Sequence, residues 1–204
     1  MSFLGFTLWF FISAIILGAS AWSASILLRQ KHAWETFAKK HNMAYQKGKF
    51  LSSPTVTGTI GRYRVAFFAA ERQAYDVRQR RMLTGIEITL PDGLIDGGAV
   101  GTKEMLPFMN TLNTLHPFVP DNEKWDKNLT FYVRNEEQVK AWLTDERLAH
   151  ILAIVGIRNA DCLFLFDGAQ AIVRIETPDP LTDAVKMDKA VQRIMRHGDA
   201  LIAA

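Results

Sequence analysis

Side chains able to do chemistry are few in this chain of 204 residues, and they are scattered. The five histidines form neither a His-x-x-x-His nor a His-Glu-x-x-His pattern, either of which would turn two ring nitrogens toward one zinc ion. They are His32, His41, His116, His150 and His197. The single cysteine, Cys162, is followed by Leu-Phe-Leu and is predicted to be a buried, inert thiol. We therefore expect no metal site, no catalytic cysteine and no intramolecular disulfide, in keeping with a reducing compartment.

A glycine-rich segment from Pro91 to Gly101 is the most suggestive stretch for ligand binding. A phosphate-binding loop needs Gly-Lys-Ser/Thr, because the lysine reaches the phosphates and the hydroxyl binds magnesium, but the order here is Gly101-Thr102-Lys103. The dinucleotide fingerprint fails as well, because Asp96 occupies its first glycine position. We expect a flexible loop without a cofactor, followed by a short helix that Thr102 caps and that runs to about Leu112.

Three carboxylates lie near this loop, at Asp92, Asp96 and Glu104. One interpretation is that the three side chains form an acid site together. The simpler one is that they are carboxylates of a loop, each in contact with water. No Gly-x-Ser-x-Gly motif of a hydrolase occurs. A membrane-anchored enzyme of unrecognised type that uses the Gly-rich loop 91–104 is therefore kept as the alternative to a non-enzymatic function.

The run from Phe3 to Leu28 contains no Asp, Glu, Lys, Arg or His. We expect this run to determine where the rest of the chain lies relative to a membrane. As a helix its 26 residues would be about 39 Å long, against about 30 Å for a hydrocarbon core. This predicts a retained transmembrane anchor over residues 1–30. Cleavage after Ala19-Ser20-Ala21 and export is the other interpretation, but only Met1 and Ser2 precede the run, which exceeds the usual apolar region of a signal peptide.

The flanks of the span predict its orientation. Five basic residues and a single acid, Glu35, follow it within about 20 residues, whereas no basic residue precedes it. We expect a single-pass protein of the inner (plasma) membrane with its N-terminus outside and its C-terminal domain in the cytoplasm.

Small side chains recur on one face of the expected span, at Ala14, Gly18, Ala21 and Ser25. This spacing would let a second helix approach closely, either from another copy of the chain or from another membrane protein. The alternative is that membrane helices are simply rich in such residues.

Charge is divided unevenly along the chain. Residues 29–81 hold 12 basic and 3 acidic side chains, net +9, and residues 82–204 hold 12 and 18, net −6. The basic half is next to the membrane, so we expect it to contact lipid headgroups or an acidic partner rather than nucleic acid. The candidate contact residues are Arg29, Lys31, Lys39, Lys40, Lys47, Lys49, Arg78, Arg80 and Arg81.

Beyond the span, hydrophobic periodicity predicts an α+β domain with a mostly antiparallel sheet covered by helices on one face. A juxtamembrane helix and linker (31–53) is expected to lead into a cytoplasmic domain (54–204). The expected strands are 55–60, 64–70, 80–90, 128–134, 161–167 and 169–177, with turns at Gly61-Arg62 and Asp167-Gly168. Helices are expected over 135–143, where Asn135 caps, over 148–155, and at the C-terminus, where Asp179 caps and Pro180 is the first helical residue.

The order Phe131-Tyr132-Val133-Arg134-Asn135, then Ala141-Trp142-Leu143-Thr144, then a short helix and the hairpin from Phe164 to Val173 resembles uncharacterised bacterial membrane-anchored domains of unknown function. The resemblance implies a cytoplasmic α+β domain behind membrane helices, with no established catalytic residues to transfer.

Together these features predict a non-enzymatic accessory or scaffold subunit of a membrane complex. It would act through its span and its cytoplasmic domain. The expected partners are membrane lipid and either a membrane protein or a second copy of the chain, and no cofactor is expected.

Overall fold

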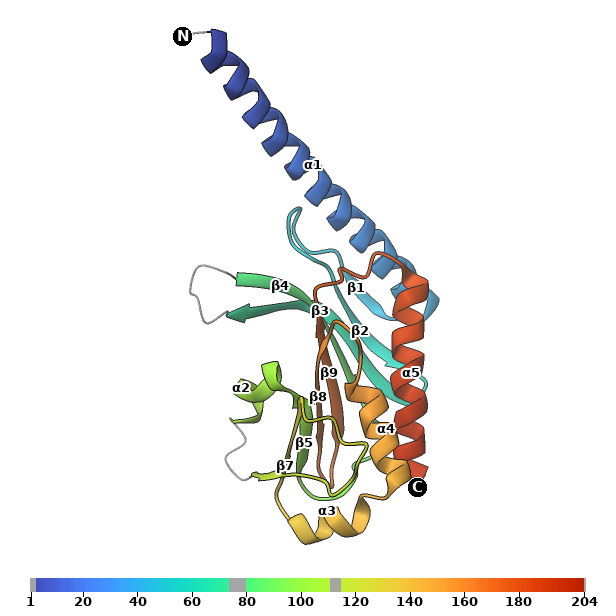
Figure 1. The fold of residues 1–204 in the computed structure, drawn as a ribbon. Coiled ribbons are helices and arrows are strands. Elements are labelled where there is room, and N and C mark those ends of the chain that lie inside the picture. The colour runs from blue at the N-terminus through green and yellow to red at the C-terminus, as the bar shows by residue number, and fades with distance from the viewer. Residues whose placement is uncertain (1–2, 74–79, 111–114, 204) are drawn as a thin grey trace.

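The computed structural model describes residues 3–73, 80–110 and 115–203 (Figure 1). Its longest element is helix α1 (Phe3–Lys40), whose N-terminal part extends away from the rest of the chain. The helix ends where Asn42 adopts a left-handed conformation (φ 53°) and the Met43 N–H bonds the Ala38 carbonyl. The expected span and the expected juxtamembrane helix are thus one continuous rod.

The described residues contain one nine-stranded sheet in the order β1-β2-β3-β4-β9-β8-β5-β7-β6. Every neighbouring pair is antiparallel, which confirms the predicted α+β class. The strands are β1 (Ala44–Gln46), β2 (Thr55–Ile60), β3 (Tyr63–Gln73), β4 (Arg80–Thr89), β5 (Gly98–Thr102), β6 (His116–Phe118), β7 (Leu129–Val133), β8 (Asp161–Phe166) and β9 (Ala171–Thr177).

Helices cover this sheet unequally. The shorter ones are a 3-10 turn (Lys103–Met105), α2 (Leu106–Met109), α3 (Glu136–Trp142), α4 (Asp145–Val155) and α5 (Ala184–Ala203). The C-terminal end of α1 lies with α4 and α5 over one face, where their apolar side chains form the main core with alternate residues of the strands (Figure 1). A smaller cluster of Ala99, Met105, Met109 and Leu163 packs α2 against the other face.

Local sequence signals set the turns and one helix start as predicted. The β2–β3 turn holds Gly61 at φ 59°, a conformation that glycine adopts without steric cost. In the β8–β9 hairpin the Asp167 carboxylate accepts from the N–H groups of Ala169 and Gln170, both at 2.8 Å. Asn135 caps α3 by accepting from the Gln138 N–H at 3.1 Å.

The Gly-rich segment was predicted wrongly as loop throughout, because its second half is β5, which lies between β8 and β7. Its residues Gly98–Val100 are buried, and glycine here admits the close approach of neighbouring strands rather than a turn. Thr102 does not cap the following helix; its hydroxyl makes no capping bond. The edge strands β1 and β6 were also missed, because three-residue strands carry little periodicity.

The C-terminal helix begins four residues later than predicted, at Ala184 rather than Pro180. Asp179 instead accepts from the Leu181 N–H (2.8 Å), and Leu181 has a left-handed φ of 53°. This conformation prevents the helix from starting at Pro180. Asp183 binds the Val185 N–H at 2.8 Å and so takes the capping position.

Candidate functional site

Helix α1 has an apolar first part, which extends away from the domain, and a last part that packs in the domain core. It is long and apolar enough to cross a membrane, by length and composition, and none of the side chains of its apolar window is buried. Three turns further on, Trp34 and Phe37 are completely buried and each packs against the Phe67 ring, with centroid distances of 5.7 and 5.0 Å. Any orientation that a bilayer imposes on the rod is therefore passed to the domain.

The expected helix-contact face is available on this rod. Ala14, Gly18 and Ala21 are exposed and Ser25 is half-buried. A Cβ added at Gly18 would meet nothing within 4 Å. Three of the four positions are therefore not covered by the domain.

The basic residues next to the span fall into two groups. Arg29, Lys47 and Lys49 are exposed. Lys31 is buried to 6% exposure and donates to the main-chain carbonyls of Lys49 (2.7 Å) and Phe50 (3.1 Å), so its ammonium group is already engaged.

Lys39 and Lys40 form ion pairs within the chain. Lys39 pairs with Glu35 one turn away (2.6 Å), and Lys40 pairs with Asp188 of α5 (2.5 Å). Asp188 also lies 2.6 Å from Nε2 of His41. Burial alone would raise the pKa of Asp188, but the hydrogen bonds from Lys40 and His41 outweigh it and lower the pKa. The Asp188 carboxylate therefore links the C-terminal end of α1 to α5.

Of the three remaining arginines of the expected contact set, the structure describes two. Arg80 and Arg81 belong to β4, opposite Gln73 and Arg72 of β3. Arg78 lies outside the described residues.

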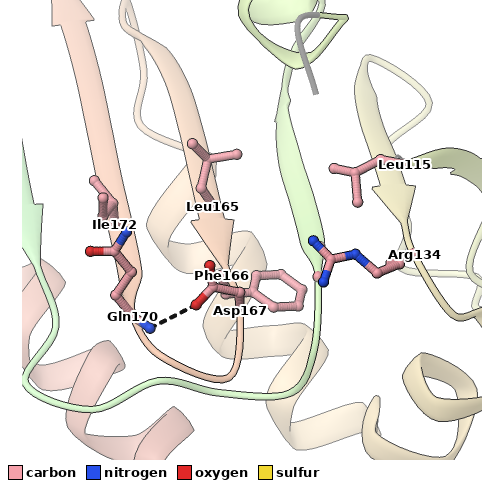
Figure 2. Close-up of a pocket in the computed structure, with 9 residues that line it drawn as sticks. Leu115, Arg134, Leu165, Phe166, Asp167, Gln170 and Ile172 are labelled. Carbon is pink, nitrogen blue, oxygen red and sulfur yellow. Dashed lines mark hydrogen bonds between the residues drawn. The ribbon is translucent and has the colours of Figure 1, made fainter. Parts of the chain in front are cut away.

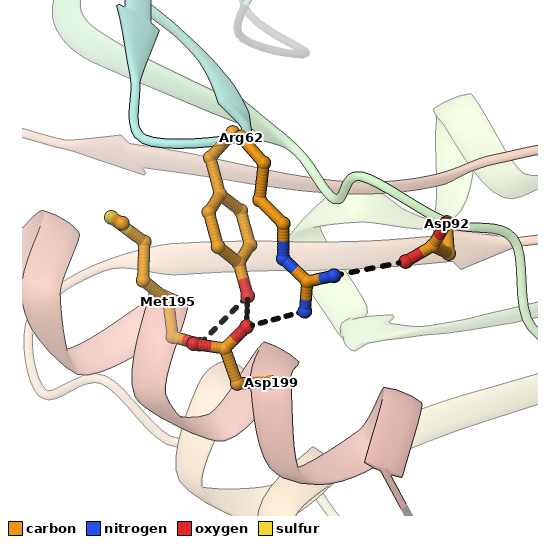
Figure 3. A network of polar contacts seen from close by, with 5 residues as sticks. Arg62, Asp92, Met195 and Asp199 are labelled. Atoms are coloured by element: carbon orange, nitrogen blue, oxygen red, sulfur yellow. Dashed lines mark hydrogen bonds and ion pairs between the residues drawn. The ribbon is translucent and has the colours of Figure 1, made fainter.

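A second polar tie joins the β2–β3 turn to α5 (Figure 3). The hydroxyl of buried Tyr63 lies 2.6 Å from Oδ1 of Asp199 and 3.0 Å from the Met195 carbonyl. Arg62 reaches Asp199 (2.9 Å) with one nitrogen and Asp92 (3.3 Å) with another. Burial and the Asp199 carboxylate raise the pKa of Tyr63, and the hydrogen bonds from Tyr63 and Arg62 lower that of Asp199.

Glycines of the Gly-rich segment are packing residues. A Cβ at Gly98 would lie 2.2 Å from Cζ of Phe166, and one at Gly101 would lie 2.7 Å from the Cys162 carbonyl oxygen. Contacts under 3.0 Å are not tolerated by real Cβ atoms. Glycine is therefore required at positions 98 and 101 for β5 to lie this close to β8.

The three carboxylates of this segment do not share a site. Asp92 pairs with Arg62, whereas Asp96 pairs with Arg134 at 2.6 Å. Glu104 is exposed on the 3-10 turn. The three carboxylates of loop 91–104 thus have separate surroundings, and residues 98–102 of that segment form strand β5.

A small hollow of about 200 Å³ remains beside Gly97 and Gly98 (Figure 2). The Arg134 side chain lies on one side of it, with Asp167 and Gln170 on the other, as Figure 2 shows. The volume is below the roughly 300 to 1,000 Å³ of ordinary small-molecule pockets. One guanidinium nitrogen of Arg134, Nη1, already donates to Oδ1 of Asp96 at 2.6 Å.

On the sheet face that α2 partly covers, the Arg174 guanidinium lies between two aromatic rings. Its Cζ is 5.2 Å from the Phe68 centroid and 4.9 Å from that of Phe108. Nε and Nη2 both reach Oε1 of Glu176, at 3.0 and 2.8 Å. Sequence reasoning missed this group, although the spacing of two residues in β9 places both charges on one face.

Two of the histidines contact each other, and the cysteine lies in the core. Nδ1 of His150 in α4 lies 3.0 Å from Nδ1 of His197 in α5. Burial, and then the charge of His150, lower the pKa of His197. Cys162 is fully buried, and burial raises the pKa of its thiol to about 12. Among the described residues, no three His, Cys, Asp or Glu side chains are grouped so as to hold a metal ion.

Comparison with known proteins gives little to add to this geometry. No protein-family model matches the chain, and no curated protein matches it. Among solved structures, it is similar to the crystal structure of the mycobacterial trehalose monomycolate transport factor A, TtfA, with a TM-score of 0.49 and 11% identity over 84% of this chain and 94% of that one. A likeness of this degree establishes neither a shared fold nor a shared function.

Proposed function

We propose that this chain is a single-pass membrane protein that acts as a non-enzymatic accessory or scaffold subunit. The N-terminus would be outside the cell membrane and the α+β domain would be in the cytoplasm. The observation that carries the proposal is the continuity of α1, whose first part is apolar and exposed and whose last part is in the domain core. A domain joined so stiffly to a span keeps a fixed height above the bilayer, which suits the assembly of other proteins at that height.

The exposed small-residue face of α1 supports a partner within the membrane. Ala14, Gly18, Ala21 and Ser25 follow one side of the helix, where a second helix can approach the backbone. The partner would be another membrane protein or a second copy of this chain.

Co-purification of the tagged full chain tests the proposal. The chain would carry a C-terminal tag, be extracted in mild detergent or native nanodiscs, and be examined by mass spectrometry. We expect a stoichiometric membrane protein or a dimer, and we expect Gly18→Leu to reduce its recovery several-fold, because the larger side chain separates the helices. Ser23→Leu is the matched control, since it adds the same side chain about 140° round the helix from Gly18.

A lone monomer from both preparations, unaffected by Gly18→Leu, would contradict the subunit proposal. Protease treatment of intact cells, whose membrane is sealed, tests the orientation separately. The C-terminal tag should stay protected until the membrane is opened.

A further inference from the structure

The loop between β1 and β2 presents two adjacent large apolar side chains to solvent. Phe50 is 81% exposed and Leu51 is 78% exposed, more than any of the exposed large apolar side chains of α1, which reach 70% at Ile15 and Trp22. Figure 1 shows that this loop lies beside α1 and points toward the end from which the free part of the helix extends. Exposed neighbours of this kind mark an interaction surface.

Lys31 fixes the height of this loop along α1. Its Nζ bonds the carbonyl oxygens of Lys49 and Phe50, and the Tyr45 hydroxyl donates to the Lys31 carbonyl at 3.2 Å. Helical side chains point toward the N-terminus of the helix, so the bonded carbonyls lie about one turn before Lys31. The loop tip is therefore level with the last residues of the uncharged run.

The length of that run places this level relative to a bilayer. About 20 residues cross a hydrocarbon core of about 30 Å. Counted from Phe3, these end near Trp22 and leave Ser23–Leu28 in the headgroup layer. Residues 24–27 of α1 are half-buried and Gln30 is the first buried one, so the domain begins in the same layer.

The charge around the loop matches an anionic lipid surface. Lys47 and Lys49 come directly before the apolar pair in the loop and are exposed, as is Arg29 on the adjacent helix. No Asp or Glu occurs anywhere in residues 36–70. The negative potential of such a surface attracts basic residues that lie close to it.

We propose that loop 47–53 inserts Phe50 and Leu51 into the interfacial layer of the bilayer that α1 crosses, with Lys47 and Lys49 at the lipid phosphates. The inference rests on the proposed membrane anchor and adds a second contact, which fixes the tilt and rotation of the domain. A protein partner fits less well, because two side chains supply far less than the roughly 1,000 Å² of a stable protein interface. Lipid needs no such area.

Depth-dependent fluorescence quenching tests this in the full chain. The protein would be placed in nanodiscs of phosphatidylcholine with a quarter phosphatidylglycerol, with an environment-sensitive dye on Leu51→Cys, Leu17→Cys or Val119→Cys. Native Cys162 is fully buried, and the unsubstituted chain measures its labelling. Val119 is 75% exposed and follows β6, the sheet edge opposite β1.

We expect lipid with a shallow spin label to quench the dye at 51 at least twofold more than the dye at 119. Deep spin labels should quench the dye at 17. Quenching at 17 without quenching at 51 would overturn the insertion proposal alone, and shielding of 51 from aqueous iodide would then indicate contact with a second copy of the chain, the only other protein in the nanodisc bilayer. Loss of quenching at 17 would instead overturn the membrane anchor.

A pair of lysine variants tests the tie that sets the height. Lys31→Met removes both bonds to the loop carbonyls, so quenching at 51 should fall at least twofold. Lys39→Met removes the same charge from an exposed side chain that bonds only within its own helix and should change nothing. Unchanged quenching in Lys31→Met would overturn the role of Lys31.

Discussion

The ring of Phe166 in β8 lies over the bare backbone of Gly98 in β5. A Cβ at position 98 would come within 2.2 Å of the ring, so the two residues are complementary in shape. This contact explains why a segment rich in glycine, which by sequence alone predicts a ligand-binding or flexible loop, forms an inner strand of the sheet instead.

Gly98→Ala is expected to destabilise the domain by about 1 to 3 kcal/mol, because the added methyl group overpacks the core. The free energy of unfolding can be measured by chemical denaturation of the full chain in detergent. Gly168→Ala is the control, since a Cβ there meets nothing within 4 Å. If the contact is the cause, Phe166→Leu in the same chain should recover part of the loss from Gly98→Ala; equal effects at 98 and 168 would contradict it.

Tyr63→Phe is expected to lower the free energy of unfolding by about 1 to 2 kcal/mol, because it removes a buried hydroxyl that bonds the Asp199 carboxylate. Arg62→Met removes the exposed ion pair with the same carboxylate and should cost less than Tyr63→Phe, because water and salt screen an exposed pair. Thermal unfolding of the two variants side by side gives the ranking. A larger loss from Arg62→Met would show that the hydroxyl bond is not the main tie to α5.

Asp188→Asn should loosen the end of α1 from α5 and cost about 1 to 2 kcal/mol, because two charge-assisted bonds to a largely buried carboxylate are weakened. Hydrogen exchange would report it as faster exchange at the C-terminal turn of α1. The exposed pair is the comparison, since Glu35→Gln should leave exchange there nearly unchanged. Equal protection in both variants would show that packing of Phe37 alone holds the helix.

The His150–His197 contact predicts a pH dependence. Burial first, then His150 and the charges of Arg193 and Arg196, lower the pKa of His197 in the folded chain. The unfolded chain therefore binds the proton more readily, so stability is retained above the ordinary histidine pKa of about 6.5 and is lost as the pH falls below it. The free energy of unfolding should decrease between pH 7.5 and 5.5, and His197→Phe should make that decrease shallower. The same slope in the variant would place the titrating group elsewhere.

Sequence reasoning worked where the cause is local. An uncharged run of 26 residues forms a helix whatever surrounds it, because its backbone groups bond within the helix. Asp167-Gly168 and Gly61 make their turns through their own side chain and backbone freedom, and Asn135 caps the helix that it precedes. These features determined the long apolar helix, the hairpins and the α+β class.

Tertiary structure decided what depends on residues distant in the chain. The glycines of β5 indicate a strand only when Phe166 and Cys162 of β8 lie against them. In the sequence, Lys31 is one more basic residue after an apolar run. In the structure, its ammonium group donates to the main-chain carbonyls of Lys49 and Phe50, 18 and 19 residues away, and these bonds set the position of Phe50 along α1. Which charges stay free for lipid or a partner is settled by such long-range contacts, and a linear pattern does not record them.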